Sequence, residues 1–189
     1  NENLNFRVCV DTSPIMEKPI AQKAGLGWIG KHTNLINNDI GSWFFISEIL
    51  LDIKLDYDKY FEEDLCGTCT KCLDACPTNA LQPYILDSNK CISYLTIEHR
   101  GEIAKEYSSN LDEWIYGCDI CQEVCPWNIK FSKISIEDRF LKRKEIKKMK
   151  KIDWDTISKK KYNEIFKKSA IKRTKYEGIT RNIKLNNKK

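Results

Sequence analysis

The sequence predicts an α+β protein in three consecutive parts: residues 1–60, a cysteine-rich domain over 61–130, and a short helical tail over 131–189. Three observations predict this. Short apolar runs between turn residues indicate strands and a helix in the first part, and closely spaced cysteines fill the second. Apolar residues at helical spacing and many lysines mark the third. A chain of 189 residues that is 41% hydrophobic is long enough for one large domain or two small ones.

The first part reads as short elements separated by turn residues. A buried strand over 7–11 ends at an acid, and the helical composition of 15–24 stops at Gly25 and Gly27, which suit a helix C-terminus. The remaining predictions for this part are a strand over 35–36, a turn over 37–41, a strand over 42–51 and an acidic loop over 52–64. Further along, we predict helices over 91–98 and 111–115.

Beyond Lys130 the apolar spacing is helical. It predicts two apolar helix faces, one formed by Ile134, Ile136, Phe140 and Leu141, and the other by Ile157, Tyr162, Ile165 and Phe166. No apolar stretch is long enough for a membrane span, so we expect no membrane partner.

Eight of the nine cysteines follow a pattern that two iron–sulfur clusters require. The run from Cys66 to Pro77 is C-x₂-C-x₂-C-x₃-C-P, the run of bacterial two-cluster ferredoxins. The run from Cys118 to Pro126 is C-x₂-C-x₃-C-P, and Cys91 upstream can supply its missing ligand. The pattern therefore predicts a ferredoxin-like domain with two [4Fe-4S] clusters that transfers electrons.

In such motifs the fourth cysteine of a run ligates the other cluster. We therefore predict one cluster on Cys66, Cys69, Cys72 and Cys125, and a second on Cys76, Cys91, Cys118 and Cys121. Zinc is the alternative, but zinc sites usually pair two separate C-x₂-C knuckles, which this spacing fits poorly. Cys9 lies in an apolar run and is predicted to be a small buried hydrophobe. Thiolates kept for metal favour a reducing compartment, the cytoplasm.

Charge is divided unevenly along the chain. Residues 1–125 contain 10 Lys and Arg against 20 Asp and Glu, whereas residues 126–189 contain 22 against 7. A basic tail behind an acidic part favours an anionic partner, with nucleic acid first. The alternative is compositional drift, because 18 of those 22 basic residues are lysine.

Two features of the first part leave a functional and a structural interpretation open. Gly25, Gly27 and Gly30 have G-x-G-x-x-G spacing but follow a helix, so the loop either approaches a cofactor or is a plain turn. Asp11 ends the first strand, where shielding from water would favour a protonated carboxyl able to donate its proton. It could instead cap the helix that follows Pro14.

At these positions the sequence resembles the epoxyqueuosine reductase family. The resemblance covers nearly the whole chain. The residues that carry it are 10–18, 24–31, 41–50, 66–78, 91–98, 116–122, 169–174 and 178–182.

The resemblance implies that residues 1–60 are the C-terminal part of a nitroreductase-like cobalamin domain. It also implies an oxidoreductase of queuosine biosynthesis, which reduces epoxyqueuosine to queuosine in the tRNA anticodon stem-loop. Electrons from an unidentified low-potential donor would pass through both clusters to cobalamin. Asp11 would be the proton donor. Residues near cobalamin would be Asp11, Trp28, Lys31, Thr33, Asn34 and Ser93, and residues near tRNA phosphates would be Lys172, Arg173 and Arg181.

Three other functions compete with this one. A two-cluster ferredoxin-type electron carrier explains the cysteines but gives residues 1–60 and the basic tail no role. A reductive dehalogenase shares cobalamin and two clusters but has no use for a basic tail. A nucleic-acid-binding module with structural clusters would need no redox cycling.

Overall fold

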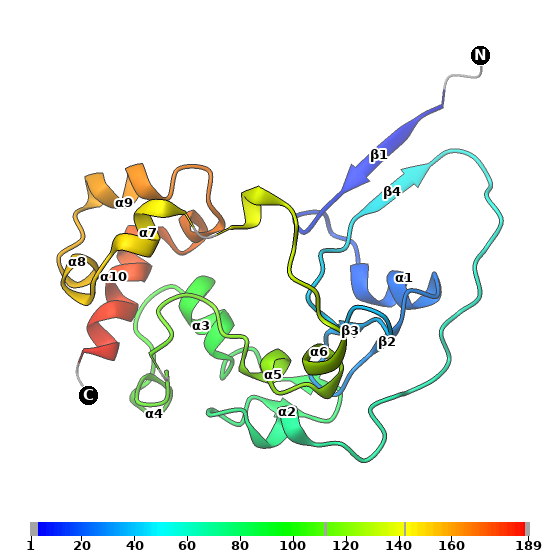
Figure 1. Cartoon of the computed structure of the whole chain (residues 1–189), viewed down its shortest axis with the longest axis horizontal. Helices are drawn as coiled ribbons and strands as arrows, with labels where there is room; N and C mark the ends of the chain where they lie inside the picture. Colours follow the sequence, from blue (N-terminus) through cyan, green and yellow to red (C-terminus); the bar gives the residue numbers. More distant parts are fainter. Residues whose placement is uncertain (1–3, 112, 142, 188–189) are drawn as a thin grey trace. The chain divides into compact units, whose positions relative to one another are not determined.

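The computed structural model describes residues 4–111, 113–141 and 143–187 (Figure 1). The chain forms two compact units. The first unit comprises Asn1–Ala75, Leu81–Ile85 and Cys121–Lys133, and the second comprises Cys76–Ala80, Leu86–Ile120 and Ile134–Lys189. Helices and strands occur together, as the predicted α+β class requires. The division into three sequence domains stays a prediction.

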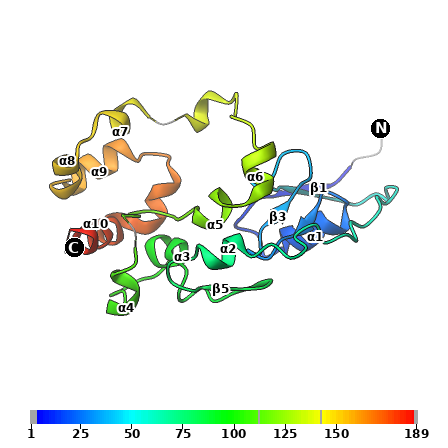
Figure 2. The same cartoon turned by 60° about the horizontal axis from the view of Figure 1, so that its bottom comes forward.

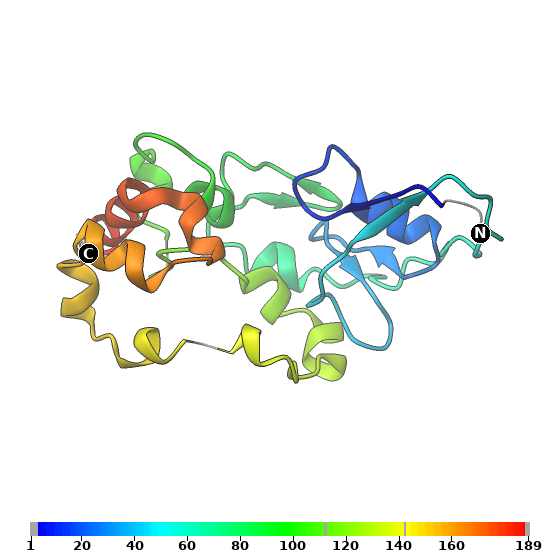
Figure 3. The ribbon, with the colours of Figure 1, turned by 90° about the horizontal axis from the view of Figure 1, so that it is seen from above.

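Two small antiparallel sheets and one helix form the first part of unit one. Strand β1 (Phe6–Cys9) pairs with β4 (Glu48–Leu51), which Figures 1 and 3 both show, and Cys9 lies opposite Glu48. Strand β2 (Trp28–Ile29) pairs with β3 (Leu35–Ile36), and helix α1 (Glu17–Lys23) packs against both. Cys9 is only 1% exposed, so its prediction as a buried hydrophobe is confirmed.

Of the strand, turn and strand predicted over 35–51, the second strand is wrong in its first half. The turn exists, since Asn37 and Gly41 exchange backbone hydrogen bonds. The chain then leaves β3, because the amide of Ser42 donates to the Asn128 side chain at 2.6 Å and the Ser42 hydroxyl to Gln122 at 2.9 Å. The next strand begins only at Glu48, and its partner is β1.

The rest of unit one is short helices around the cysteine runs. They are α2 (Lys71–Asp74), α5 (Ile120–Glu123), which begins at the boundary of the unit, and α6 (Pro126–Phe131). A hairpin of β5 (Leu81–Gln82) and β6 (Ile85–Leu86) follows α2. The loop predicted over 52–64 has no regular element. The core of the unit contains Trp28, Ile36 and Cys125, with Phe61 and Trp127 against it.

The second unit is helical. Its elements are α3 (Ile92–Ile97), α4 (Lys105–Ser108), η1 (Asp138–Phe140), α7 (Lys144–Lys148), α8 (Lys151–Asp155), α9 (Lys159–Ile165), η2 (Ala170–Thr174) and α10 (Lys175–Asn186). Helix α10 contacts α3, α8 and η2 (Figure 2). The core cluster contains Ile157, Tyr162, Ile165, Phe166, Ile179 and Ile183. The second predicted helix face is therefore confirmed.

Two helical predictions are wrong. Residues 113–115 form turns instead of a helix, although Leu111 is fully buried; residue 112 lies outside the described residues. Residues 132–137 form no regular element, and Ile134 and Ile136 are 94% and 101% exposed. Helices this short form only when packing supports them, so apolar spacing without a covering surface did not produce one. In the described part of the chain, no helix has the length and apolarity needed to span a membrane.

Candidate iron–sulfur site and its surroundings

Four cysteines border one cavity of 180 Å³ in unit one: Cys66, Cys69, Cys72 and Cys125. These are the four predicted for the first cluster, although they come from two runs more than fifty residues apart. Within the described ranges, no three His, Cys, Asp or Glu side chains are arranged to hold a single metal ion. The thiols surround a cavity and do not converge on one position. This arrangement suits a cluster of several atoms better than a single ion. Their role as ligands stays a prediction.

Burial raises the pKa of two of these thiols, Cys72 and Cys125, so they stay protonated unless a cation is bound. Burial, together with the neighbouring Cys66 and Cys125, raises the pKa of the Cys72 thiol to about 11. Burial also raises the pKa of Cys125, while hydrogen bonds from the backbone amides of Trp127 and Asn128 oppose the rise. A bound metal compensates such charges, because a coordinated thiol is deprotonated outright. The site is therefore chemically suited to iron.

Lys31 and Asp64 fix the loop that carries Cys66 and Cys69. The Lys31 ammonium donates to the carbonyl oxygens of Gly67 at 2.6 Å and Cys69 at 2.9 Å. The Asp64 carboxylate accepts from the amide of Cys66 at 2.9 Å. Lys31 was predicted to bind cobalamin, but in this structure its side chain supports the cysteine loop.

Asn128 fixes the other side of the cavity, where helix α6 begins directly after Cys125. Its fully buried side chain accepts from the amide of Ser42 and donates to the Ser42 hydroxyl at 2.9 Å and the Gln122 carbonyl at 2.8 Å. Gly41 permits this approach, since it has φ +77° and a Cβ there would lie 2.2 Å from the Asn128 oxygen. Neither residue was singled out from the sequence.

His32 also lines the cavity and was missed as a site residue. It is 3% exposed, and burial, reinforced by the charge of Lys18, lowers its pKa to about 4. The ring is therefore neutral at pH 7. Its position in a glycine-rich stretch, next to the predicted cofactor residues, is the only signal that the sequence offers.

In unit two, three of the four cysteines predicted for the second cluster influence one another. Burial raises the pKa of the Cys118 thiol to about 11, and Cys91 and Cys76 contribute. The Cys76 sulfur accepts a hydrogen bond from the amide of Ala80 at 3.3 Å. The fourth, Cys121, belongs to unit one. The ligand set of this cluster stays a prediction.

The other predicted cobalamin residues of unit one are engaged within the unit. Trp28 is 1% exposed and packs edge-on against Trp127, with 4.9 Å between the ring centroids. The Lys18 ammonium donates to the Thr33 carbonyl at 2.9 Å and to the Asn34 side chain at 3.1 Å. Burial lowers the pKa of Lys18. These contacts form an internal scaffold for residues 31–34.

Asp11 lies in an exposed bend after β1, with φ +54°. The amide of Thr12 donates to the Val10 carbonyl at 2.5 Å, which closes a tight turn around it. The expected shielding from water is absent. The capping alternative is also wrong, because α1 begins after Met16 and has no side-chain cap. A positive φ at a non-glycine residue occurs in turns and also at functional sites.

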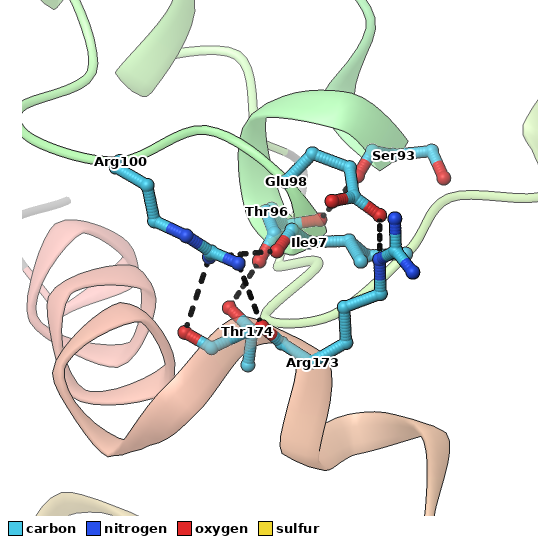
Figure 4. A network of polar contacts seen from close by, with 7 residues as sticks. All are labelled: Ser93, Thr96, Ile97, Glu98, Arg100, Arg173 and Thr174. Atoms are coloured by element: carbon cyan, nitrogen blue, oxygen red, sulfur yellow. Dashed lines mark hydrogen bonds and ion pairs between the residues drawn. The ribbon is translucent and has the colours of Figure 1, made fainter. Parts of the chain in front are cut away.

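Ser93 and Arg173 belong to a polar network in unit two (Figure 4). The Ser93 carbonyl accepts from the Thr96 hydroxyl at 3.3 Å. Arg173 pairs with Glu98 on α3, and the Arg100 guanidinium donates to the Arg173 carbonyl at 2.8 Å. The network joins α3, which follows Cys91, to η2. The proposed cofactor role of Ser93 and tRNA role of Arg173 stay predictions.

Arg181 is a structural side chain. Its guanidinium donates to the carbonyl oxygens of Leu95 at 2.8 Å, His99 at 3.0 Å and Gly101 at 2.6 Å. These contacts hold α10 against the end of α3. Contact of Arg181 with tRNA phosphate stays a prediction, and this geometry does not favour it.

Replacing Arg181 with Met should lower the free energy of unfolding by about 2 kcal/mol, because three carbonyls lose a charged donor. The shift would be measured by urea unfolding followed by circular dichroism. Lys184→Met is the matched control, since Lys184 is an exposed lysine on the same helix. Equal effects of both substitutions would contradict the structural role.

Comparisons with known proteins agree with this site. The family described as 4Fe-4S double cluster binding domain matches residues 65–128, which include all eight predicted ligands. The chain is 50% identical over 177 residues to the epoxyqueuosine reductase of Leadbetterella byssophila, covering 94% of this chain and 57% of the relative. The chain thus spans little more than half of that relative.

Solved structures give the same relationship. A crystal structure of selenomethionine-labelled epoxyqueuosine reductase has a TM-score of 0.89 and 32% identity, covering 97% of this chain and 48% of that one. An epoxyqueuosine reductase with an epoxyqueuosine-modified tRNA-Tyr stem loop has a TM-score of 0.83 and 30% identity. The match covers 96% of this chain and 48% of that chain. The Bacillus subtilis enzyme, solved with its catalytic aspartate loop swung out of the active site, has a TM-score of 0.83 and 28% identity, covering 98% and 48%.

A reductive dehalogenase shares the fold alone. Its TM-score is 0.52 at 23% identity, covering 68% of this chain and 19% of that chain. The resemblance of the sequence to the epoxyqueuosine reductase family is confirmed by the relatives and structures of that family.

Proposed function

We propose that this chain, which is related to the epoxyqueuosine reductases, takes part in reducing epoxyqueuosine to queuosine in tRNA. The observation that carries the proposal is the cavity bordered by four cysteines, in a chain that matches those enzymes over 94% of its length. The clusters would deliver electrons one at a time from a low-potential donor. We also propose the cytoplasm as its location, because thiolates kept for iron need a reducing compartment.

Removing an epoxide oxygen to leave an alkene consumes two electrons and two protons and releases water. The clusters supply electrons but no acidic proton at the substrate. Asp11, held exposed in its tight turn, is our candidate donor to the leaving oxygen. The Bacillus subtilis relative was solved with a catalytic loop, named for an aspartate, swung out of its active site, and this supports an aspartate at this position.

Cobalamin, which we propose as the cofactor, would supply a strongly reducing centre when bound. The residues of this chain do not form a complete cradle for it. The Lys31 and Asn34 side chains already have partners in unit one, Trp28 is packed among aromatic rings, and Ser93 belongs to unit two. We therefore derive no step through cobalamin from these residues.

We propose the basic tail as the surface for the tRNA stem-loop. The crystal structure of a relative with such a stem loop supports tRNA as the substrate. Arg143 donates to the carbonyls of Ile165, Lys167 and Lys168, which leaves both lysine side chains exposed on a fixed loop. Lys172 is also exposed, above the Tyr162 ring. Phosphate oxygens of an RNA would bind such ammonium groups.

Replacing Lys167, Lys168 and Lys172 with Gln should weaken binding of the anticodon stem-loop and flatten its salt dependence. Each lost phosphate contact should lower the slope of log K against log salt by about 0.7 to 0.9. Fluorescence anisotropy across a salt titration measures both quantities. Replacing Lys23, Lys54 and Lys59 removes equal charge from unit one and serves as control. If both triple variants bind equally well, the tail is only a solvated basic face.

The function itself is tested by supplying epoxyqueuosine-containing tRNA, cobalamin and a chemical reductant to the reconstituted protein. Mass spectrometry of the digested RNA should show loss of one oxygen from the modified nucleoside. Clusters that cycle electrons while the nucleoside stays unchanged would favour the electron carrier instead.

A further inference from the structure

A buried hydrogen-bond donor in the wall of the cysteine cavity has no partner. The Nδ1 atom of His32 accepts a hydrogen bond from the amide of Asn34 at 3.2 Å. Because Nδ1 accepts this hydrogen bond, it carries no proton, and the N–H of the ring is on Nε2. That nitrogen is buried and has no hydrogen-bond partner among the described residues. A buried donor left unpaired destabilises the fold, so its position calls for an explanation.

The ring lies close to Gly30, where a Cβ would be 3.3 Å from the His32 Cε1 atom. The residues that follow it are fixed, because the Lys18 ammonium donates to the Thr33 carbonyl and to the Asn34 side chain. Asn34 in turn supplies the amide that Nδ1 accepts from.

We propose that His32 donates a hydrogen bond from Nε2 to a sulfur atom of the cluster held by Cys66, Cys69, Cys72 and Cys125. The four thiols and the imidazole border the same cavity, whose other walls include Ile36, Leu65 and Pro126. Sulfur, as cysteine thiolate or inorganic sulfide, is the acceptor that a cluster in this cavity presents. The inference rests on the cluster assignment made under the proposed function, and gives His32 a positioning and tuning role.

Such a bond would favour the reduced cluster, which carries more negative charge on its sulfurs. Hydrogen bonds to the sulfurs are among the features that set the potentials of these clusters. His32 would make this cluster easier to reduce than the other walls of the cavity, which include Lys31 as well as apolar side chains, would make it alone. It would so help to set the direction of electron flow between the two clusters.

The direct test is spectroscopic. The chain contains only two histidines, His32 and His99, so selective isotopic labelling of histidine nitrogen reports on very few atoms. Pulsed EPR of the reduced, reconstituted chain should detect a weakly coupled histidine nitrogen and an exchangeable proton. Both should disappear in His32→Leu. They should persist in His99→Gln, the matched control, because His99 lies in unit two and contacts the Glu102 carbonyl at 2.9 Å.

A redox titration followed by EPR gives the second readout. In His32→Leu the equilibrium constant for one-electron reduction of this cluster should fall about tenfold, which is about 59 mV in potential. His32→Gln keeps an N–H donor and should recover part of the shift, while the other cluster, as internal control, should not change.

Normal iron content without the nitrogen coupling would overturn the role of His32 and leave the cluster assignment intact. An equal shift of both clusters would also overturn it. A chain that binds no iron would instead contradict the proposed function. If His32→Leu fails to fold, the labelled parent protein still decides, since its spectrum alone shows whether a histidine nitrogen is coupled.

Discussion

Replacing Asp11 with Asn should reduce epoxide reduction by about 10²-fold or more, the loss typical of removing a general acid. The amide has nearly the same shape but cannot donate the acidic proton. Asparagine also tolerates the positive φ of 54° that this position adopts, so the turn should survive. Single-turnover conversion of epoxyqueuosine in tRNA, followed by mass spectrometry, measures the effect.

Both clusters should remain in Asp11→Asn, because the residue lies outside the cysteine cavity. Iron content and the visible absorption of the protein therefore serve as internal controls. The matched variant is Asp39→Asn, which changes another exposed aspartate of unit one and should retain full activity. Near-normal turnover by Asp11→Asn would remove the residue from the mechanism and leave it as a turn former.

The cysteine pattern could be predicted because it is local chemistry at fixed spacing. Spacing alone grouped Cys125 with Cys66, and the structure places both at one cavity. The sequence did not reveal how this is achieved. Asn128 depends on Gly41 and Ser42, more than eighty residues away, and no periodicity encodes such a long-range hydrogen bond.

Two basic residues that the resemblance places near cobalamin or tRNA phosphate have partners within the protein. Arg181 and Lys31 look alike in sequence to residues that bind phosphates or cofactors. In the structure both donate to backbone carbonyls, Arg181 at the end of α3 and Lys31 on the cysteine loop. A basic side chain can donate to a backbone carbonyl or to a phosphate. The sequence does not show which of these two acceptors it will bind. The helical predictions for 113–115 and for residues up to 137 were wrong, because the spacing of apolar residues does not show whether another surface will cover them.

Replacing Cys72 with Ala should remove one cluster and halve the iron of the reconstituted chain, from about eight to about four atoms. Cys72 is 8% exposed, and the other cysteines that line its cavity are themselves predicted ligands, so none of them is free to replace it. Electron transfer to the substrate should be lost, because one of the two relays is gone. Anaerobic iron and sulfide analysis gives the count, and EPR shows whether the remaining cluster keeps its signal.

Cys9→Ala is the matched control for this substitution. Cys9 is equally buried, at 1% exposure, but lies in β1 and borders no part of the cysteine cavity. Its replacement leaves a comparable small void, so any iron lost through destabilisation alone should be lost in both variants. Iron that falls equally in both would mean that Cys72 supports the fold without ligating a cluster. Iron unchanged in both would remove Cys72 from the ligand set, and zinc in place of iron would overturn the redox function altogether.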